Sequence, residues 1–261
     1  MQLVLQRFVL QRASPIFVAA LAVSCAVLPA QALLIRADRD DAEYLELATR
    51  YNAAVALPGG GEAVLIASNW LLTTARLAKA LPADARIVIA GKRYEIATTR
   101  VHPAWSGGAA NDIGLVHLRG GTSIDDIEPL QLYRGDNEGG KAVVIVAHGT
   151  SGKIGSSERA TDRKARAAIN TIDRIGARVF DMQIKPASDA SDLQGALTPG
   201  ELGAPAIVET TQGLFVVGIA NAIDGEWESY ARVSAYASWI EAAMVDTAKR
   251  EVEQLLDPDR R

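Results

Sequence analysis

Short apolar runs separated by turn residues fill the chain from residue 62 to residue 234, and they constrain the fold more than any other feature. The runs are rich in Val, Ile, Leu and Tyr, and Gly, Pro or Asn residues stand between them. The segments predicted as strands are 62–68, 69–75, 86–91, 92–101, 112–119, 141–149, 177–184, 204–210, 214–222 and 229–234. Many short strands joined by turns indicate an all-β fold, either an antiparallel sandwich or barrels.

Three further segments divide the chain. The glycine-rich, acidic stretch 120–140 separates the strands into two groups and indicates a connection. Residues 38–52, which begin with acids, and residues 235–256 have helical periodicity. The expected division is a leader at 1–32, an N-terminal extension with a helix at 33–56, a first strand group at 57–121, a linker at 122–140, a second strand group at 141–234, and a C-terminal helix and tail at 235–261.

The leader has the three parts of a secretory signal peptide. Basic residues precede the apolar run 16–28, and Ala30 and Ala32 follow at the spacing of a cleavage site. The run is too short to span a membrane, which takes about 18 or more apolar residues. A lipoprotein signal ending at Cys25 is the weaker alternative, because Ala22 stands where such signals usually carry Leu. We therefore expect cleavage after Ala32, no membrane anchor, and a secreted or periplasmic protein.

Charge and cysteine content exclude several classes of function. Loss of Arg7 and Arg12 with the leader changes the net charge from −4 to −6, with 25 basic against 31 acidic side chains. An acidic chain without a basic run offers nothing to nucleic acid, so no nucleic-acid partner is expected. The one cysteine, Cys25, leaves with the leader, which predicts a mature protein without disulfides. With three histidines and no other cysteine, we expect no metal site and no cofactor.

Four stretches, taken in order, resemble the trypsin and chymotrypsin family of serine proteases. They are similar to the segments that carry the catalytic histidine, the catalytic aspartate, the nucleophile, and the last strand with its closing helix. The stretches are NWLLTTARLA (69–78), HPAW with NDIGLVHL (102–118), GELGAP with GLFVVGIANA (200–222), and YARVSAYASWIEAAM (230–244). Residues 35–57 further resemble the N-terminal part of bacterial members. The resemblance covers nearly all of the chain after the leader, and the order of the motifs is that of chymotrypsin. It implies two six-stranded antiparallel β-barrels, with a short N-terminal helix and a C-terminal helix.

Two residues of the family's catalytic triad are replaced at the matching positions. Arg76 stands at the histidine position and Leu202 at the serine position, and only the aspartate is retained, as Asp112. Leucine has no nucleophilic atom, and arginine stays protonated at any working pH. Loss of nucleophile or base in such a triad lowers turnover about 10⁶-fold. The resemblance therefore implies a protein without ordinary peptidase activity.

The loop around Leu202 departs from the family pattern in other ways. Gly200, Glu201, Leu202 and Gly203 form the oxyanion-like loop, and Glu201 is one methylene longer than the family's aspartate. The oxyanion hole would use the backbone N–H groups of Gly200 and Leu202, which do not depend on the side chains. Ala196 occupies the position of the acid that selects basic side chains in trypsin-like enzymes, so the pocket is expected to be neutral. The usual activation sequence is missing, and no zymogen switch is predicted.

Arg76 and Asp112 are expected to form an ion pair in the place of the family's histidine–aspartate contact. A charge-assisted hydrogen bond between them would satisfy a partly buried acid. The alternative is an Arg76 side chain turned to solvent, with Asp112 bonded by the backbone.

A relocated nucleophile is the alternative source of activity. Among the three histidines, only His148 lies near a serine, Ser151. His102 precedes a proline in a turn, and His117 alternates with apolar residues in a strand. A loop histidine beside a turn serine is the more ordinary interpretation of the first pair.

Three functions remain open. The first is an inactive, exported protease homologue that binds a protein or peptide, of unknown identity, and acts as a regulatory pseudoenzyme. The second is a serine hydrolase that uses Ser151 and His148. The third is a structural descendant without a specific ligand, since a fold does not by itself supply a function.

Overall fold

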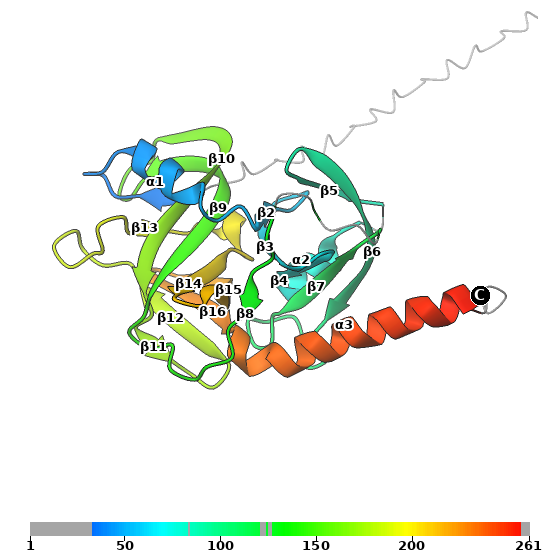
Figure 1. The fold of residues 1–261 in the computed structure, drawn as a ribbon. Helices are drawn as coiled ribbons and strands as arrows, with labels where there is room; N and C mark the ends of the chain where they lie inside the picture. The colour runs from blue at the N-terminus through cyan, green and yellow to red at the C-terminus, as the bar shows by residue number, and fades with distance from the viewer. Residues whose placement is uncertain (1–32, 83, 121–123, 125–126, 257–261) are drawn as a thin grey trace, which may run out of the picture.

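The computed structural model describes residues 33–82, 84–120, 124 and 127–256. It contains two mainly antiparallel β-structures packed side by side, with a short helix near the N-terminus and a long helix at the C-terminus (Figure 1). The leader expected at 1–32 and the final residues 257–261 lie outside the described residues.

The first structure is a nearly closed six-stranded barrel. Its strands are β2 (Ala54–Ala56), β3 (Glu62–Ala67), β4 (Trp70–Thr73), β5 (Arg86–Ile89), β6 (Lys92–Val101) and β7 (Gly114–Leu118). They run in the order β2-β3-β4-β7-β6-β5, every pair is antiparallel, and β2 contacts β5. The central strands β4 and β7 are buried along their whole length, so the barrel has a continuous apolar interior.

The second sheet has ten strands, of which six are long. The long ones are β9 (Ala142–Lys153), β10 (Arg159–Thr171), β12 (Val179–Gln183), β14 (Pro205–Thr210), β15 (Gly213–Asp224) and β16 (Trp227–Arg232). The two-residue strands are β1 (Leu34–Ile35), β8 (Gln131–Leu132), β11 (Arg174–Ile175) and β13 (Gly195–Ala196). The main path is β11-β12-β16-β15-β14-β9-β1-β13, with β10 on β9 and β8 on β15. Two barrel-like β-structures with helices at both ends confirm the expected all-β, two-barrel fold.

The sequence-based boundaries shift at three places. Strand β2 belongs to the first barrel, so the barrel begins at Ala54 and not at residue 57. The linker region 122–140 contains β8, which pairs in parallel with β15. Strand β10 was not among the predicted strands, although at 13 residues it is the longest in the described chain.

Helix α1 (Asp41–Ala48) is shorter than the predicted 38–52 and is held against β10 by Arg166. The Arg166 guanidinium donates to both carboxylate oxygens of Asp41, at 2.5 and 2.7 Å, and to both of Asp162, at 2.9 and 2.8 Å. Its side chain is 2% exposed. This arginine therefore fixes the N-terminal segment on the second β-structure.

Helix α3 (Val233–Leu256) begins two residues before the expected start at 235, because β16 runs into it without a turn. It leaves the second β-structure and extends along the first barrel (Figure 1). The Arg100 Nε–H donates to the Thr247 hydroxyl at 3.2 Å, and His117 Nδ1 lies 3.0 Å from the Glu251 carboxylate. No helix in the described part of the chain is both long and apolar enough to cross a membrane.

Candidate active site and its surroundings

Arg76 lies in the first turn of α2 (Ala75–Ala80), immediately after β4. Thr74 caps this helix, since its hydroxyl accepts a hydrogen bond from the Leu77 N–H at 3.2 Å. The Arg76 side chain is 39% exposed, so one end of it meets solvent. The strand and the short helix place the guanidinium at the edge of the first barrel, beside Asp112.

Asp112 is completely buried and receives two hydrogen bonds from Arg76. The backbone N–H of Arg76 donates to Oδ1 at 2.9 Å, and its Nε–H donates to Oδ2 at 2.8 Å. The expected ion pair is therefore present, and the backbone contact accompanies it. Burial raises the pKa of the Asp112 carboxyl above its usual value, although the N–H groups and charge of Arg76 act in the opposite direction.

Leu202 follows the single 3₁₀ turn η1 (Pro199–Glu201) and is partly buried. The carbonyl of Gly200 accepts a hydrogen bond from the Gly61 N–H at 3.0 Å, and the carbonyl of Leu202 accepts one from the Glu62 N–H at 2.9 Å. These bonds join the second β-structure to the start of β3 in the first barrel. The loop backbone is therefore held in place although no serine stands in it.

Gly203 is required by the geometry of the same loop. Its φ of +93° lies in the left-handed region that favours glycine, and a Cβ there would lie 2.0 Å from the carbonyl oxygen of Glu62. Its N–H donates to the Ala220 carbonyl at 2.7 Å. The backbone next to Leu202 therefore lies close to the backbone of Glu62, and this approach requires a glycine at position 203.

Glu201 is buried beneath the loop. Its Oε2 accepts the Thr198 N–H at 2.6 Å, and within the described chain its Oε1 has no hydrogen-bond partner. Burial raises the pKa of this carboxyl well above its usual value. Burial therefore opposes the negative charge that the sequence implies for this loop.

The expected specificity position, Ala196, lies in β13 and pairs with Leu34 of β1. The N–H of the next residue, Leu197, donates to a buried carboxylate that sequence reasoning did not identify, that of Glu228, at 2.5 Å. The Tyr230 hydroxyl donates to its other oxygen at 2.8 Å. Burial raises the pKa of Glu228 to about 7. A buried acid of β16 therefore lies behind the strand that carries Ala196.

His148 and Ser151 do not form a catalytic pair. Both lie in β9, where the Ser151 hydroxyl donates to the Ala160 carbonyl at 3.4 Å. The His148 ring instead places Nδ1 2.9 Å from the Oε2 of Glu62, and its backbone N–H donates to Oε1 at 2.7 Å. Glu62 is the second buried acid that the sequence did not reveal.

The other two histidines also lie apart from Asp112. His102 accepts the Ala104 N–H at 3.2 Å, and its ring meets Tyr236 edge-on. His117 is buried, stacks on Trp70, and lies 2.8 Å from the side-chain nitrogen of Asn69. No histidine therefore replaces the missing base beside Asp112. Among the residues that the structure describes, no group of three or more His, Cys, Asp or Glu side chains is placed to hold a metal ion.

Comparison with known proteins places the chain in a family. The sequence model of the family Trypsin matches residues 42–240, which is most of the chain. A search of curated proteins gives no match. The matched range includes every described strand except β1, and the positions of Arg76, Asp112 and Leu202. The chain belongs to the trypsin family.

Proposed function

We propose that this protein is an exported, catalytically inactive member of the trypsin family that acts by binding a protein or peptide. The observation that carries the proposal is the ion pair between Arg76 and Asp112, together with Leu202 at the nucleophile position. The retained acid holds a guanidinium where the family has its general base.

The chemistry of these groups supports an inactive site. A protonated guanidinium has no lone pair with which to take a proton, and a leucine side chain cannot attack a carbonyl carbon. Loss of nucleophile or base removes roughly 8 kcal/mol of barrier lowering, and the second loss adds little. Binding remains as the activity that the fold supports, because the loop backbone around Leu202 stays fixed by cross-barrel hydrogen bonds.

The proposal is tested first by covalent labelling. Purified mature protein is treated with a fluorophosphonate probe, which reacts with activated serines, and examined by intact mass and peptide mapping. We expect no adduct. An adduct at Ser151, or at any serine, that heat denaturation abolishes would show an active hydrolase and overturn the proposal.

A second experiment asks whether the remaining scaffold is still organised for acyl transfer. The double variant Arg76→His with Leu202→Ser restores base and nucleophile beside Asp112. We expect it to hydrolyse an activated ester at least about 100-fold faster than the wild type, a fraction of what an intact triad supplies. The single variants are the matched controls, and neither is expected to gain activity.

Binding and export need measurements of their own. A displayed peptide library selected on the wild-type protein is expected to yield sequences that lose binding when Leu202→Arg fills the loop region. If no sequence is selected, or if the selected sequences bind the Leu202→Arg protein equally well, the protein is better explained as a structural descendant without a ligand.

The N-terminal sequence of protein recovered from the periplasm or medium tests export, with Leu33 expected as the first residue.

A further inference from the structure

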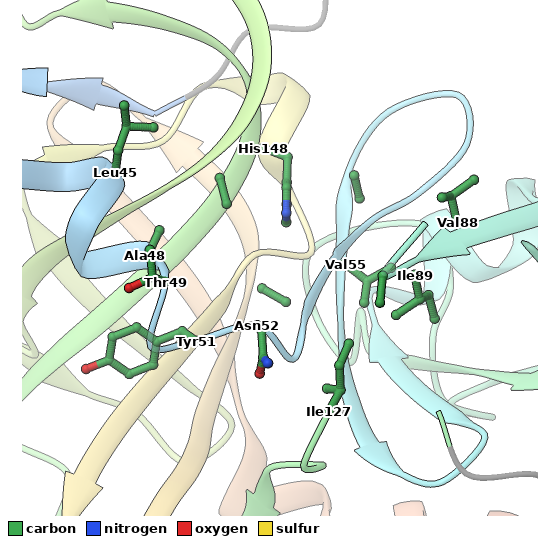
Figure 2. Close-up of a pocket in the computed structure, with 14 residues that line it drawn as sticks. Leu45, Ala48, Thr49, Tyr51, Asn52, Val55, Val88, Ile89, Ile127 and His148 are labelled. Atoms are coloured by element: carbon green, nitrogen blue, oxygen red, sulfur yellow. The ribbon is translucent and has the colours of Figure 1, made fainter. Parts of the chain in front are cut away.

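A cavity of about 540 Å³ lies between α1 and the second β-structure on one side and the first barrel on the other (Figure 2). Its walls include Ala48, Val55, Ile89, Ile127 and Ala165. Among its described lining residues, His148 is the one side chain able to carry a charge at neutral pH. Its size and apolar walls are those of a small-molecule site.

His148 is the polar group of this cavity, and its orientation is fixed. Figure 2 shows the side chain extending from its strand into the space between Ala48 and Val55. One ring nitrogen is held by the buried Glu62 carboxylate at 2.9 Å, which leaves the other for a ligand. Burial lowers the pKa of His148, but the hydrogen bond and charge of Glu62 outweigh it and raise that pKa above its usual value. When the ring is protonated, this free nitrogen carries an N–H that can donate to a ligand.

A second cavity, of about 330 Å³, adjoins the first, and His148 and Ala56 line both. It is bordered by the glycines at 59–61 and by Arg163. A side chain added at Gly59 or Gly60 would meet nothing within 4 Å, so the backbone is open to a ligand here. In the part of the chain that the structure describes, Arg163 has no acidic partner, while the charge of Glu62 is taken up by His148. This end of the groove is therefore positive.

We propose that the two cavities together bind a small carboxylic acid with an apolar body, its tail in the first cavity and its carboxylate between His148 and Arg163. The apolar walls at one end and the excess positive charge at the other select this chemistry over a neutral lipid or a cation. Neither Arg76 nor Leu202 lines the groove, but Gly200 of the oxyanion-like loop borders its second cavity, so the site adjoins the loop proposed above to bind a peptide.

Titration calorimetry with octanoate tests the site on the mature protein. We expect saturable binding with one molecule bound, and no saturable binding of methyl octanoate, which has the same tail without the charge. Absence of saturable octanoate binding, or equal binding of the ester, would overturn the proposal.

Two variants locate the ligand. Arg163→Gln removes an exposed cation and is expected to weaken octanoate binding about tenfold, whereas Arg93→Gln, an equally exposed change on β6, is expected to leave it unchanged. Ala165→Phe fills the first cavity and is expected to weaken binding at least tenfold. Full affinity in the Arg163→Gln protein would contradict the site. A peptide with a free C-terminal leucine is the competing ligand. If it displaces octanoate and binds tenfold more tightly than octanoate does, the groove is a site for a peptide C-terminus and the proposal is overturned.

Discussion

At residue scale, the Arg76–Asp112 contact shows how a triad position can lose its base without loss of the fold. The retained carboxyl is fully buried, and a buried acid needs hydrogen-bond donors. Both the backbone N–H and the guanidinium of Arg76 supply them. Arg76 therefore supplies the buried Asp112 carboxylate with the hydrogen bonds that the family's histidine would otherwise give it.

Removal of this guanidinium alone is expected to destabilise the protein. In Arg76→Leu, position 76 still donates its backbone N–H to Asp112 but no longer its guanidinium. The free energy of unfolding is expected to fall by about 1–3 kcal/mol. This range allows for the partial exposure of Arg76. Urea denaturation at pH 7 measures the change.

The double variant Arg76→Leu with Asp112→Asn serves as the control for that prediction. It removes both charges, and we expect it to recover part of the loss, because no unpaired buried carboxylate remains. A single variant as stable as the wild type would show that the backbone hydrogen bond alone satisfies Asp112.

At element scale, the longer strands with an apolar run were predicted from sequence, whereas the longest strand, β10, was not. Strand β10 reads RATDRKARAAINT, and its first six residues are exposed and mostly polar, so it carries no hydrophobic run that marks a strand. Its place is determined by pairing along β9, which single-sequence patterns do not reveal. Helix α1 is shorter than predicted because Thr49 ends it, while Asp40 precedes it as an N-cap with an extended backbone and Asp38 lies in a turn.

The site follows the same division. Arg76, Asp112 and Leu202 were located from sequence because the surrounding motifs keep their order and spacing. Glu62 and Glu228 were missed, since an acid in a strand normally indicates a solvent-facing position. For Glu228 a signal existed: two residues on, Tyr230 shares its inward face, because side chains alternate along a strand.

The contact between α1 and β10 depends on one buried side chain. Arg166→Met should lower the free energy of unfolding by about 2–4 kcal/mol, since it leaves Asp41 and Asp162 without their shared cation. The variant should raise the rate of amide hydrogen exchange more in α1 than in β15, because the helix loses its anchor to the sheet. The matched control is Arg50→Met, which breaks an exposed pair with Glu209 and is expected to cost less than about 1 kcal/mol. Equal effects of the two changes would contradict the anchoring role.

At the scale of the whole molecule, the described interior holds five acids, Glu62, Asp112, Glu138, Glu201 and Glu228. Glu201 lies close enough to Glu62 and to Glu228 for their charges to interact, and burial raises the pKa of Glu201 and of Glu228 above the usual value. A raised folded-state pKa means that the folded protein holds protons which the unfolded chain has already released. Stability from these groups is therefore complete below the unfolded pKa and is lost as the pH rises through the folded one.

The protein should consequently unfold more easily at pH 8 than at pH 5. Glu228 alone, with a usual pKa of 4.5 raised to about 7, accounts for about 2.5 kcal/mol of this difference. His148 acts in the same direction, because its raised pKa makes its contribution complete at low pH and lost above neutrality. Asp38 and Asp162, whose pKa values the neighbouring arginines lower to about 2, lose their contribution only at far lower pH.

Urea denaturation at both pH values, on the wild type and on Glu228→Gln, separates the contribution of this one buried acid. The glutamine cannot ionise, and its amide oxygen can still accept the Leu197 N–H, so we expect the difference between pH 5 and pH 8 to shrink by about 2.5 kcal/mol. Glu226→Gln, two residues away and exposed, should leave the difference as it is in the wild type. Identical pH dependence in both variants would mean that Glu228 is ionised in the folded protein throughout this range, with the Leu197 N–H and the Tyr230 hydroxyl sufficient to hold its charge.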